Sequence, residues 1–224
     1  MKKSVKFFLD TANLDDIKGG ITLGVFSGVT TNPVIVSKET HNYKDFLIKI
    51  LDTIPKNWEL SAEVKAGNTA DMVKQAKLLA VMDKRIRVKL PTNVEGLKAA
   101  EQLIEKIPLN MTVVKLPAQA MMCQALAARH KPKDILLSVF CGRINQAGYD
   151  WRPILEKISQ VDWPGKILAA SIKTPFDIAE AVAHGAEIVT APLDVYQTSL
   201  SSKLVQEDVD LFNKPFDGKD FEVR

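Results

Sequence analysis

Residues 87–95 read Arg-Val-Lys-Leu-Pro-Thr-Asn-Val-Glu, and this stretch indicates how the whole chain is built. Its first part is a short aliphatic run bounded by Pro91, which is typical of a buried strand. Its second part places the hydroxyl of Thr92 three positions before the carboxylate of Glu95, which predicts a capping box at a helix start. The stretch therefore predicts a strand that leads directly into a helix.

The same alternation of a short aliphatic run and a longer segment with apolar residues every three or four positions occurs eight times. We expect strands at residues 6–10, 28–31, 59–64, 87–90, 109–113, 135–140, 167–171 and 187–190. A second helix start is predicted at Thr174, which is followed by Pro175 and by the acid Asp177. Eight strand–helix units predict an α/β protein folded as a (β/α)8 TIM barrel.

We expect one domain over residues 1–224, with an additional C-terminal helix at 201–212 and a polar tail at 214–224. The 224 residues are 46% hydrophobic and 25% charged, which suits a globular protein with one core. The tail could pack on a neighbouring subunit or could be a frayed terminus, and the sequence leaves both open.

The charge pattern favours small anions as partners over nucleic acids or membranes. Thirty basic and twenty-seven acidic residues leave a net charge of +3, and no dense run of Lys or Arg suggests a nucleic-acid surface. No apolar stretch approaches the length of a membrane span, and the run after Met1-Lys-Lys-Ser4 is too short for a signal peptide. We therefore expect a cytoplasmic protein.

Cysteine and histidine give no support for a metal site or a disulfide framework. The two cysteines of the chain, Cys123 and Cys141, do not form a CxxC pair, and a reducing compartment fits this best. The histidines His41, His130 and His184 are dispersed and lack metal-ligand spacing. We expect no metal ion.

Polar residues gather where the predicted strands end, and in such a barrel the carboxyl ends of all strands surround one mouth. The candidates are Asp10, Thr30, Asn32, Glu63, Lys89, Asn110, Thr112, Ser138, Arg143, Ser171 and Lys173. Among them, Lys89 stands in an otherwise apolar strand. Burial disfavours an ammonium ion and favours the neutral amine, which is the nucleophile that condenses with a carbonyl. The alternatives are a lysine that reaches outward to water, or one paired for structure with Asp10 or Glu63.

Four segments of the sequence that contain candidate residues together resemble the transaldolase family. The resemblance is to its short microbial branch, which also includes the fructose 6-phosphate aldolases. They are residues 8–12 (Phe-Leu-Asp-Thr-Ala), 28–33 (Gly-Val-Thr-Thr-Asn-Pro), 87–91 (Arg-Val-Lys-Leu-Pro) and 168–175 (Leu-Ala-Ala-Ser-Ile-Lys-Thr-Pro). Their order and spacing match the family from the first strand to about residue 200. This agreement is far more specific than any single motif.

The resemblance implies a role for each matching residue. Lys89 would form a Schiff base, Asp10 would act as the acid/base, and Glu63 with Thr112 would hold a water that shuttles protons. Asn32 would position the substrate hydroxyls, while Arg143, Ser171 and Lys173 would bind the sugar phosphate. The further substrate-binding candidates at the mouth are Thr30, Asn110, Ser138 and Phe140.

Three residues make the chain look like a transaldolase rather than an aldolase: Glu63 where aldolases have glutamine, Phe140 where they have tyrosine, and Asn110. The resemblance then implies transfer of a dihydroxyacetone unit from fructose 6-phosphate to erythrose 4-phosphate, in the pentose phosphate pathway and without a cofactor. It also implies a homo-oligomer, a pentamer or a decamer. An aldolase that releases dihydroxyacetone and a barrel that binds a sugar phosphate without catalysis remain the alternatives.

Overall fold

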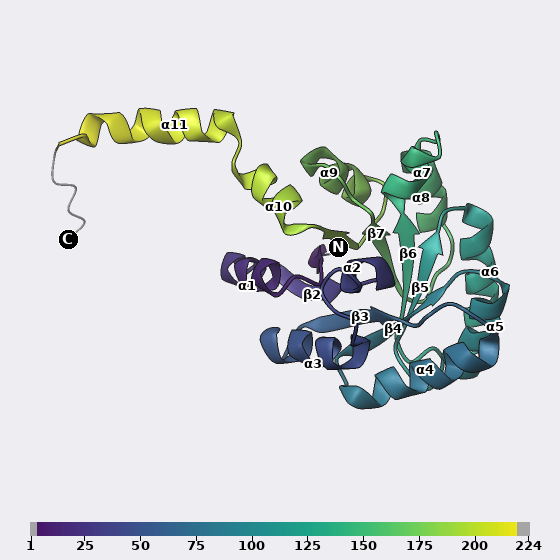
Figure 1. Ribbon diagram of the computed structural model, residues 1–224. Helices are drawn as coiled ribbons and strands as arrows, with labels where there is room; N and C mark the ends of the chain where they lie inside the picture. Colours follow the sequence, from purple (N-terminus) through teal and green to yellow (C-terminus); the bar gives the residue numbers. More distant parts are fainter. Residues whose placement is uncertain (1–3, 219–224) are drawn as a thin grey trace.

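Eight parallel strands form a closed barrel in the computed structural model, which describes residues 4–218 (Figure 1). Each strand pairs with the next along the chain, and β1 also pairs with β8. The strands are β1 (Lys6–Asp10), β2 (Phe26–Thr30), β3 (Glu59–Glu63), β4 (Ile86–Pro91), β5 (Leu109–Val114), β6 (Ile135–Phe140), β7 (Lys166–Ala170) and β8 (Ile188–Ala191). The prediction of a TIM barrel is confirmed.

Helices follow the strands, and most of them surround the barrel (Figure 1). They are α1 (Leu14–Leu23), α2 (Pro33–Val36), α3 (Tyr43–Thr53), α4 (Thr69–Met82), α5 (Val94–Leu103), α6 (Pro117–Ala127), α7 (Cys141–Gln146), α8 (Trp151–Ser159), α9 (Pro175–Ala183), α10 (Leu193–Leu200) and α11 (Lys203–Asn213). A short 3₁₀ turn, η1 (Lys214–Phe216), follows α11. The short helix α7 begins directly after β6, and α2 begins at Pro33, shortly after β2 ends at Thr30, so both helices lie at the mouth of the barrel.

The two helix starts predicted from sequence have different outcomes. Thr174 caps α9 as expected: its hydroxyl oxygen accepts from Asp177 N, and the Asp177 carboxylate accepts from Thr174 N. The capping box at Thr92 is wrong, because Asn93 is the cap and accepts from Gly96 N at 2.8 Å. Glu95 instead binds Thr69, at the start of α4. The side chain of Asn93, one residue nearer the helix, therefore caps α5 in place of the Thr92 hydroxyl.

The barrel interior holds its own small apolar cluster of Phe8, Leu136, Leu168, Ala170 and Ile188. A larger core lies between the strands and the surrounding helices. The strands are buried on both faces, which explains their almost continuous aliphatic sequences.

An ionic cluster lies in the barrel near the amino ends of the strands. The guanidinium of Arg87 on β4 is 3.0 Å from Glu59 on β3 and 2.6 Å from Asp134, which precedes β6. Arg87 also donates to the Leu109 carbonyl on β5. Because Arg87 is buried, these partners compensate the cost of desolvating its charge.

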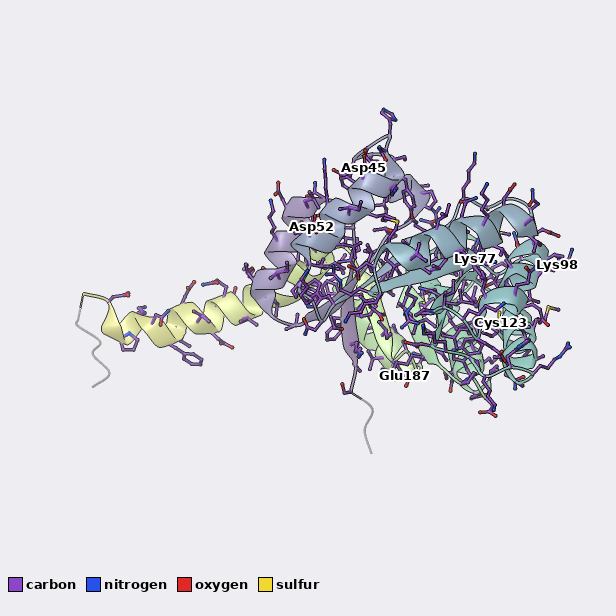
Figure 2. All side chains as sticks on the ribbon, turned by 90° about the horizontal axis from the view of Figure 1, so that it is seen from below. Asp45, Asp52, Lys77, Lys98, Cys123 and Glu187 are labelled. Carbon is purple, nitrogen blue, oxygen red and sulfur yellow. The ribbon has the colours of Figure 1, made fainter. Side chains whose placement is uncertain are left out.

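The helix α11 confirms the predicted additional C-terminal helix. It projects away from the barrel in both views (Figures 1 and 2). Every described side chain from 203 to 213 is exposed, including the apolar Val205, Val209 and Phe212. Of the predicted tail, residues 219–224 lie outside the described part. No helix within residues 4–218 is long and apolar enough to cross a membrane.

Candidate functional site

A cavity of about 500 Å³ opens at the carboxyl ends of the strands, and we call it the mouth cavity. It is lined by Asp10, Thr30, Asn32, Pro33, Val34, Ile35, Lys38, Glu63, Lys89, Val113, Ser138, Phe140, Arg143, Leu168, Ala170, Ser171, Lys173 and Thr190. The structure thus brings together all the predicted site residues except Asn110 and Thr112. Parallel strands that end at one rim account for this convergence.

Lys89 lies on β4 with its side chain inside the barrel and only 3% of the residue exposed. Its Nζ donates to the Thr31 carbonyl at 2.7 Å and lies 3.2 Å from Glu63 Oε2. Glu63 is its direct neighbour in the β3–β4 register. The outward-reaching alternative is therefore wrong, while the pairing with Glu63 is present. A pair at this distance can exchange a proton as well as hold structure.

Asp10 is the last residue of β1, and its carboxylate is held by a side chain of β2. The Thr30 hydroxyl donates to Asp10 Oδ1 at 2.8 Å and lies 2.7 Å from the Thr190 hydroxyl. Burial raises the pKa of the Asp10 carboxyl, and Lys89, Thr30 and Lys173 act in the opposite direction. Because its proton affinity is increased, Asp10 can both take and return a proton.

Glu63 is fixed from behind by α3. The Tyr43 hydroxyl donates to the Glu63 backbone carbonyl at 2.8 Å, and burial raises the pKa of Tyr43, so this phenol stays protonated. Thr112 lies on β5 as predicted, but it is fully buried and stands outside the lining of the mouth cavity. Its hydroxyl has no hydrogen-bond partner within the described residues. A buried hydroxyl in this state is one that an ordered water can satisfy.

Asn110 lies below the cavity instead of on its wall. Its Oδ1 accepts from the Ser138 hydroxyl at 2.7 Å, and its Nδ2 donates to the Ser61 hydroxyl at 3.4 Å. All three residues are buried. Asn110 therefore orients Ser138, which does line the cavity, and is placed to influence a substrate through Ser138.

Asn32 has two functions at the mouth. Its Oδ1 caps α2 by accepting from Ile35 N at 3.0 Å. Its amide nitrogen makes no hydrogen bond within residues 4–218 and lies on an asparagine that lines the cavity. This donor is free to bind a hydroxyl group.

Cationic side chains stand at the cavity rim near β6 and β7. Within the described residues, the Arg143 guanidinium on α7 donates to Gln146 Oε1 alone, at 3.2 Å, and Lys173 has no carboxylate within ion-pair distance. Ser171 lies between them with a positive φ of 60°, uncommon for a residue with a side chain. Gly142 permits this arrangement, because a Cβ there would collide with the Ser171 carbonyl. The rim can bind an anion such as a phosphate.

Phe140 lines the cavity where β6 passes into α7, in contact with the interior apolar cluster. Sequence reasoning missed Lys38, Val113, Thr190 and the α2 residues 33–35, which also line the cavity. Thr190 could have been found by applying the strand-end rule to β8. Lys38 follows α2 and no strand-end signal marks it. Within the described chain, no cluster of three His, Cys, Asp or Glu side chains is arranged to hold a metal ion.

Fold and site together define a (β/α)8-barrel protein with a buried lysine amine, two carboxylates and a rim of cationic side chains around one cavity. The family model “Transaldolase/Fructose-6-phosphate aldolase” matches residues 7–223, and the chain belongs to this family. A relative called “Probable transaldolase” in Symbiobacterium thermophilum is 36% identical over 218 residues, which cover 95% of this chain and 97% of that protein. Another of the same name in Desulfosudis oleivorans is 34% identical over 213 residues, covering 93% and 96%.

Solved structures of other barrels resemble the chain in fold. The 3-hexulose-6-phosphate synthase of Salmonella typhimurium has a TM-score of 0.58 at 12% identity, with 88% of this chain and 89% of that chain covered. At this identity the likeness concerns the fold alone.

Proposed function

We propose that this protein is a transaldolase, which transfers a dihydroxyacetone unit from a ketose phosphate such as fructose 6-phosphate to an aldose phosphate such as erythrose 4-phosphate. The observation that carries the proposal is the buried Lys89 amine, 3.2 Å from Glu63 and in one cavity with Asp10. The family to which the chain belongs includes transaldolases and aldolases, and the relatives carry the name of the former.

In the proposed reaction, the neutral Lys89 amine adds to the substrate ketone, and loss of water gives a protonated imine. Asp10 then takes the proton of the hydroxyl beyond the scissile carbon–carbon bond, the bond breaks, and its electron pair moves into the imine to form an enamine. An aldose phosphate leaves. The enamine attacks the carbonyl carbon of the acceptor aldehyde while Asp10 returns the proton to the new hydroxyl. Water finally hydrolyses the imine and releases the new ketose.

The remaining side chains have supporting roles in this proposal. Glu63 accepts and returns protons as water leaves and re-enters, and the unpaired Thr112 hydroxyl is a partner for that water. Asn32 and Ser138 bind substrate hydroxyls. Arg143, Ser171 and Lys173 bind the phosphate dianion. The reaction would belong to the pentose phosphate pathway.

The proposal is tested by reduction with borohydride in the presence of fructose 6-phosphate, followed by mass mapping of the adduct. We expect the wild type to carry one covalent adduct, at Lys89, and the Lys89→Met variant to carry none. Lys77→Met is the matched control, because Lys77 is an exposed lysine on the outer helix α4 (Figure 2). If the wild type formed no adduct, the Schiff-base reaction would be refuted, and the alternative of a barrel that binds a sugar phosphate without catalysis would remain.

A second measurement separates transfer from aldol cleavage. Product formation from fructose 6-phosphate is followed with and without erythrose 4-phosphate. Transfer requires the acceptor, so turnover should depend on it. Equal turnover without acceptor, with release of dihydroxyacetone, would make the protein an aldolase.

A further inference from the structure

Val113 has an unusual backbone at the edge of the mouth cavity. Its φ is 64°, in the left-handed region that β-branched residues rarely occupy. The β5–β6 ladder is irregular at the same place: Met111 pairs with Leu137 and Val114 with Val139. Two residues of β5, Thr112 and Val113, therefore face the single residue Ser138. This is a β-bulge with one inserted residue.

The bulge changes which way the Val113 side chain faces. In a regular strand, successive side chains point to opposite faces, and Val113 would face away from the side that carries Thr112. Instead Val113 lines the mouth cavity, together with Lys89 and Ser138. The next residue, Val114, is fully buried in the core that β5 shares with the helices. Adjacent valines thus serve different sides of the same strand.

Val113 also borders a second cavity of about 500 Å³, which we call the side cavity. Most of its lining is apolar and includes Pro91, Leu116, Ile144 and Ile154. Among the described residues, Val113 is the one that both linings share. Val113 therefore lies between the mouth cavity and the side cavity. A β-branched side chain makes a stiff partition because its χ1 rotation is restricted.

We propose that Val113 determines which aldehydes can act as acceptors. Its side chain closes the mouth cavity toward the side cavity and so excludes aldehydes that carry an alkyl or aryl group on that side. A smaller residue at 113 connects the two cavities and admits such aldehydes. The inference rests on the transfer reaction proposed above and adds a specificity-determining residue to it.

The test compares two acceptors, erythrose 4-phosphate and phenylacetaldehyde, with fructose 6-phosphate as donor. In Val113→Gly the ratio of kcat/KM for phenylacetaldehyde to that for erythrose 4-phosphate should rise by about tenfold or more, since one or two methylene groups of pocket volume discriminate by this order. Glycine accepts the positive φ without strain. Val113→Ala should shift the ratio in the same direction and by less.

Val114→Ala is the matched control, because it shortens the neighbouring valine on the helix side of β5. It should lower stability and leave the acceptor ratio as in the wild type. A ratio in Val113→Gly within about twofold of the wild type would overturn the inference, and so would an equal shift in Val114→Ala.

Direct binding of 2-phenylethanol, measured by calorimetry, tests the partition without any catalytic step. It should be about tenfold tighter in Val113→Gly than in the wild type, and equal affinities would overturn the inference even in an inactive protein. The two proposals fail differently. Without a borohydride adduct the transfer reaction fails, whereas an adduct and turnover of erythrose 4-phosphate combined with an unchanged ratio refute only the role of Val113.

Discussion

Opposing influences act on the single carboxyl group of Asp10. Burial raises its pKa, while Lys89 and the hydrogen bond from Thr30 lower it. The net effect is a carboxyl group that holds its proton more strongly than an exposed aspartate. Such a group is suited to accept a proton in one half of a reaction and to return it in the other.

We predict that Asp10→Asn lowers kcat by about 10²- to 10⁴-fold, the usual contribution of a positioned acid/base. In the wild type, kcat/KM should rise with pH as Asp10 ionises, with this limb displaced above pH 3.8, the ordinary value of the group. The limb should be absent from the residual activity of the variant. A full pH–rate profile of both proteins checks this.

The contribution of Asp10 to folding stability should fall as pH rises, whereas kcat/KM rises. Because the pKa of Asp10 is higher in the folded state than the unfolded value of 3.8, the neutral form favours folding, and this stability is lost as pH rises from 3.8 through the folded-state pKa. Asparagine stays neutral throughout. Thermal unfolding should therefore show Asp10→Asn at least as stable as the wild type at neutral pH. A marked loss of stability would contradict this account.

Most side chains of the mouth cavity could be predicted from sequence because they end strands, and strand ends are visible as polar residues after aliphatic runs. Val113 could not, since its inward direction depends on a bulge that only the pairing with β6 reveals. The sequence predicts Asn110 at the mouth because it is a polar residue on a predicted strand, but its side chain is buried and hydrogen-bonded to Ser61 and Ser138 instead of lining the cavity. The direction in which a side chain on a strand points therefore depends on partners from strands that are distant in the sequence.

Within the β2 strand, Gly28 makes room for the interior of the barrel. A Cβ there would lie 2.9 Å from the Glu59 carbonyl oxygen on β3 and 2.9 Å from the Phe8 ring. The glycine therefore allows an aromatic side chain to fill the barrel beneath the cavity. Sequence alone indicated a strand at this place, but the ring that requires the glycine is twenty residues away.

Gly28→Ala should reduce the free energy of unfolding by about 1–3 kcal/mol, the usual cost of overpacking a filled core. Gly67→Ala is the control, since nothing lies within 4 Å of its position and its φ is not positive. It should stay within about 0.5 kcal/mol of the wild type. Chemical denaturation of the two variants gives both values, and similar values would argue against close packing at Gly28.

For the molecule as a whole, the helix α11 projects from the barrel, and its described side chains are exposed. Val205, Val209 and Phe212 recur at spacings of four and three, which places them on one face of the helix, and all are exposed. An apolar face of this kind is typical of an interface. We propose that α11 packs on another copy of the chain in a homo-oligomer, a pentamer or a decamer.

The double variant Val209→Ser/Phe212→Ser should dissociate this oligomer while the barrel stays folded. Light scattering after size exclusion gives the mass, and circular dichroism checks the fold. Asp208→Ser, on the same exposed helix, should keep the mass of the wild type. A wild type that is monomeric at all concentrations would contradict the proposal.

Strand β4 carries Arg87 and Lys89 two positions apart on the same side, and the two side chains lie at different depths of the barrel. Near the amino ends of the strands, Arg87 contacts β3, β5 and the residue Asp134 before β6, whereas Lys89 lines the mouth cavity. This separation has an evolutionary consequence. Substitutions at the rim that alter substrate binding do not remove the contacts of Arg87 with Glu59, Asp134 and Leu109. The substrate preference can therefore change in evolution while these stabilising contacts remain.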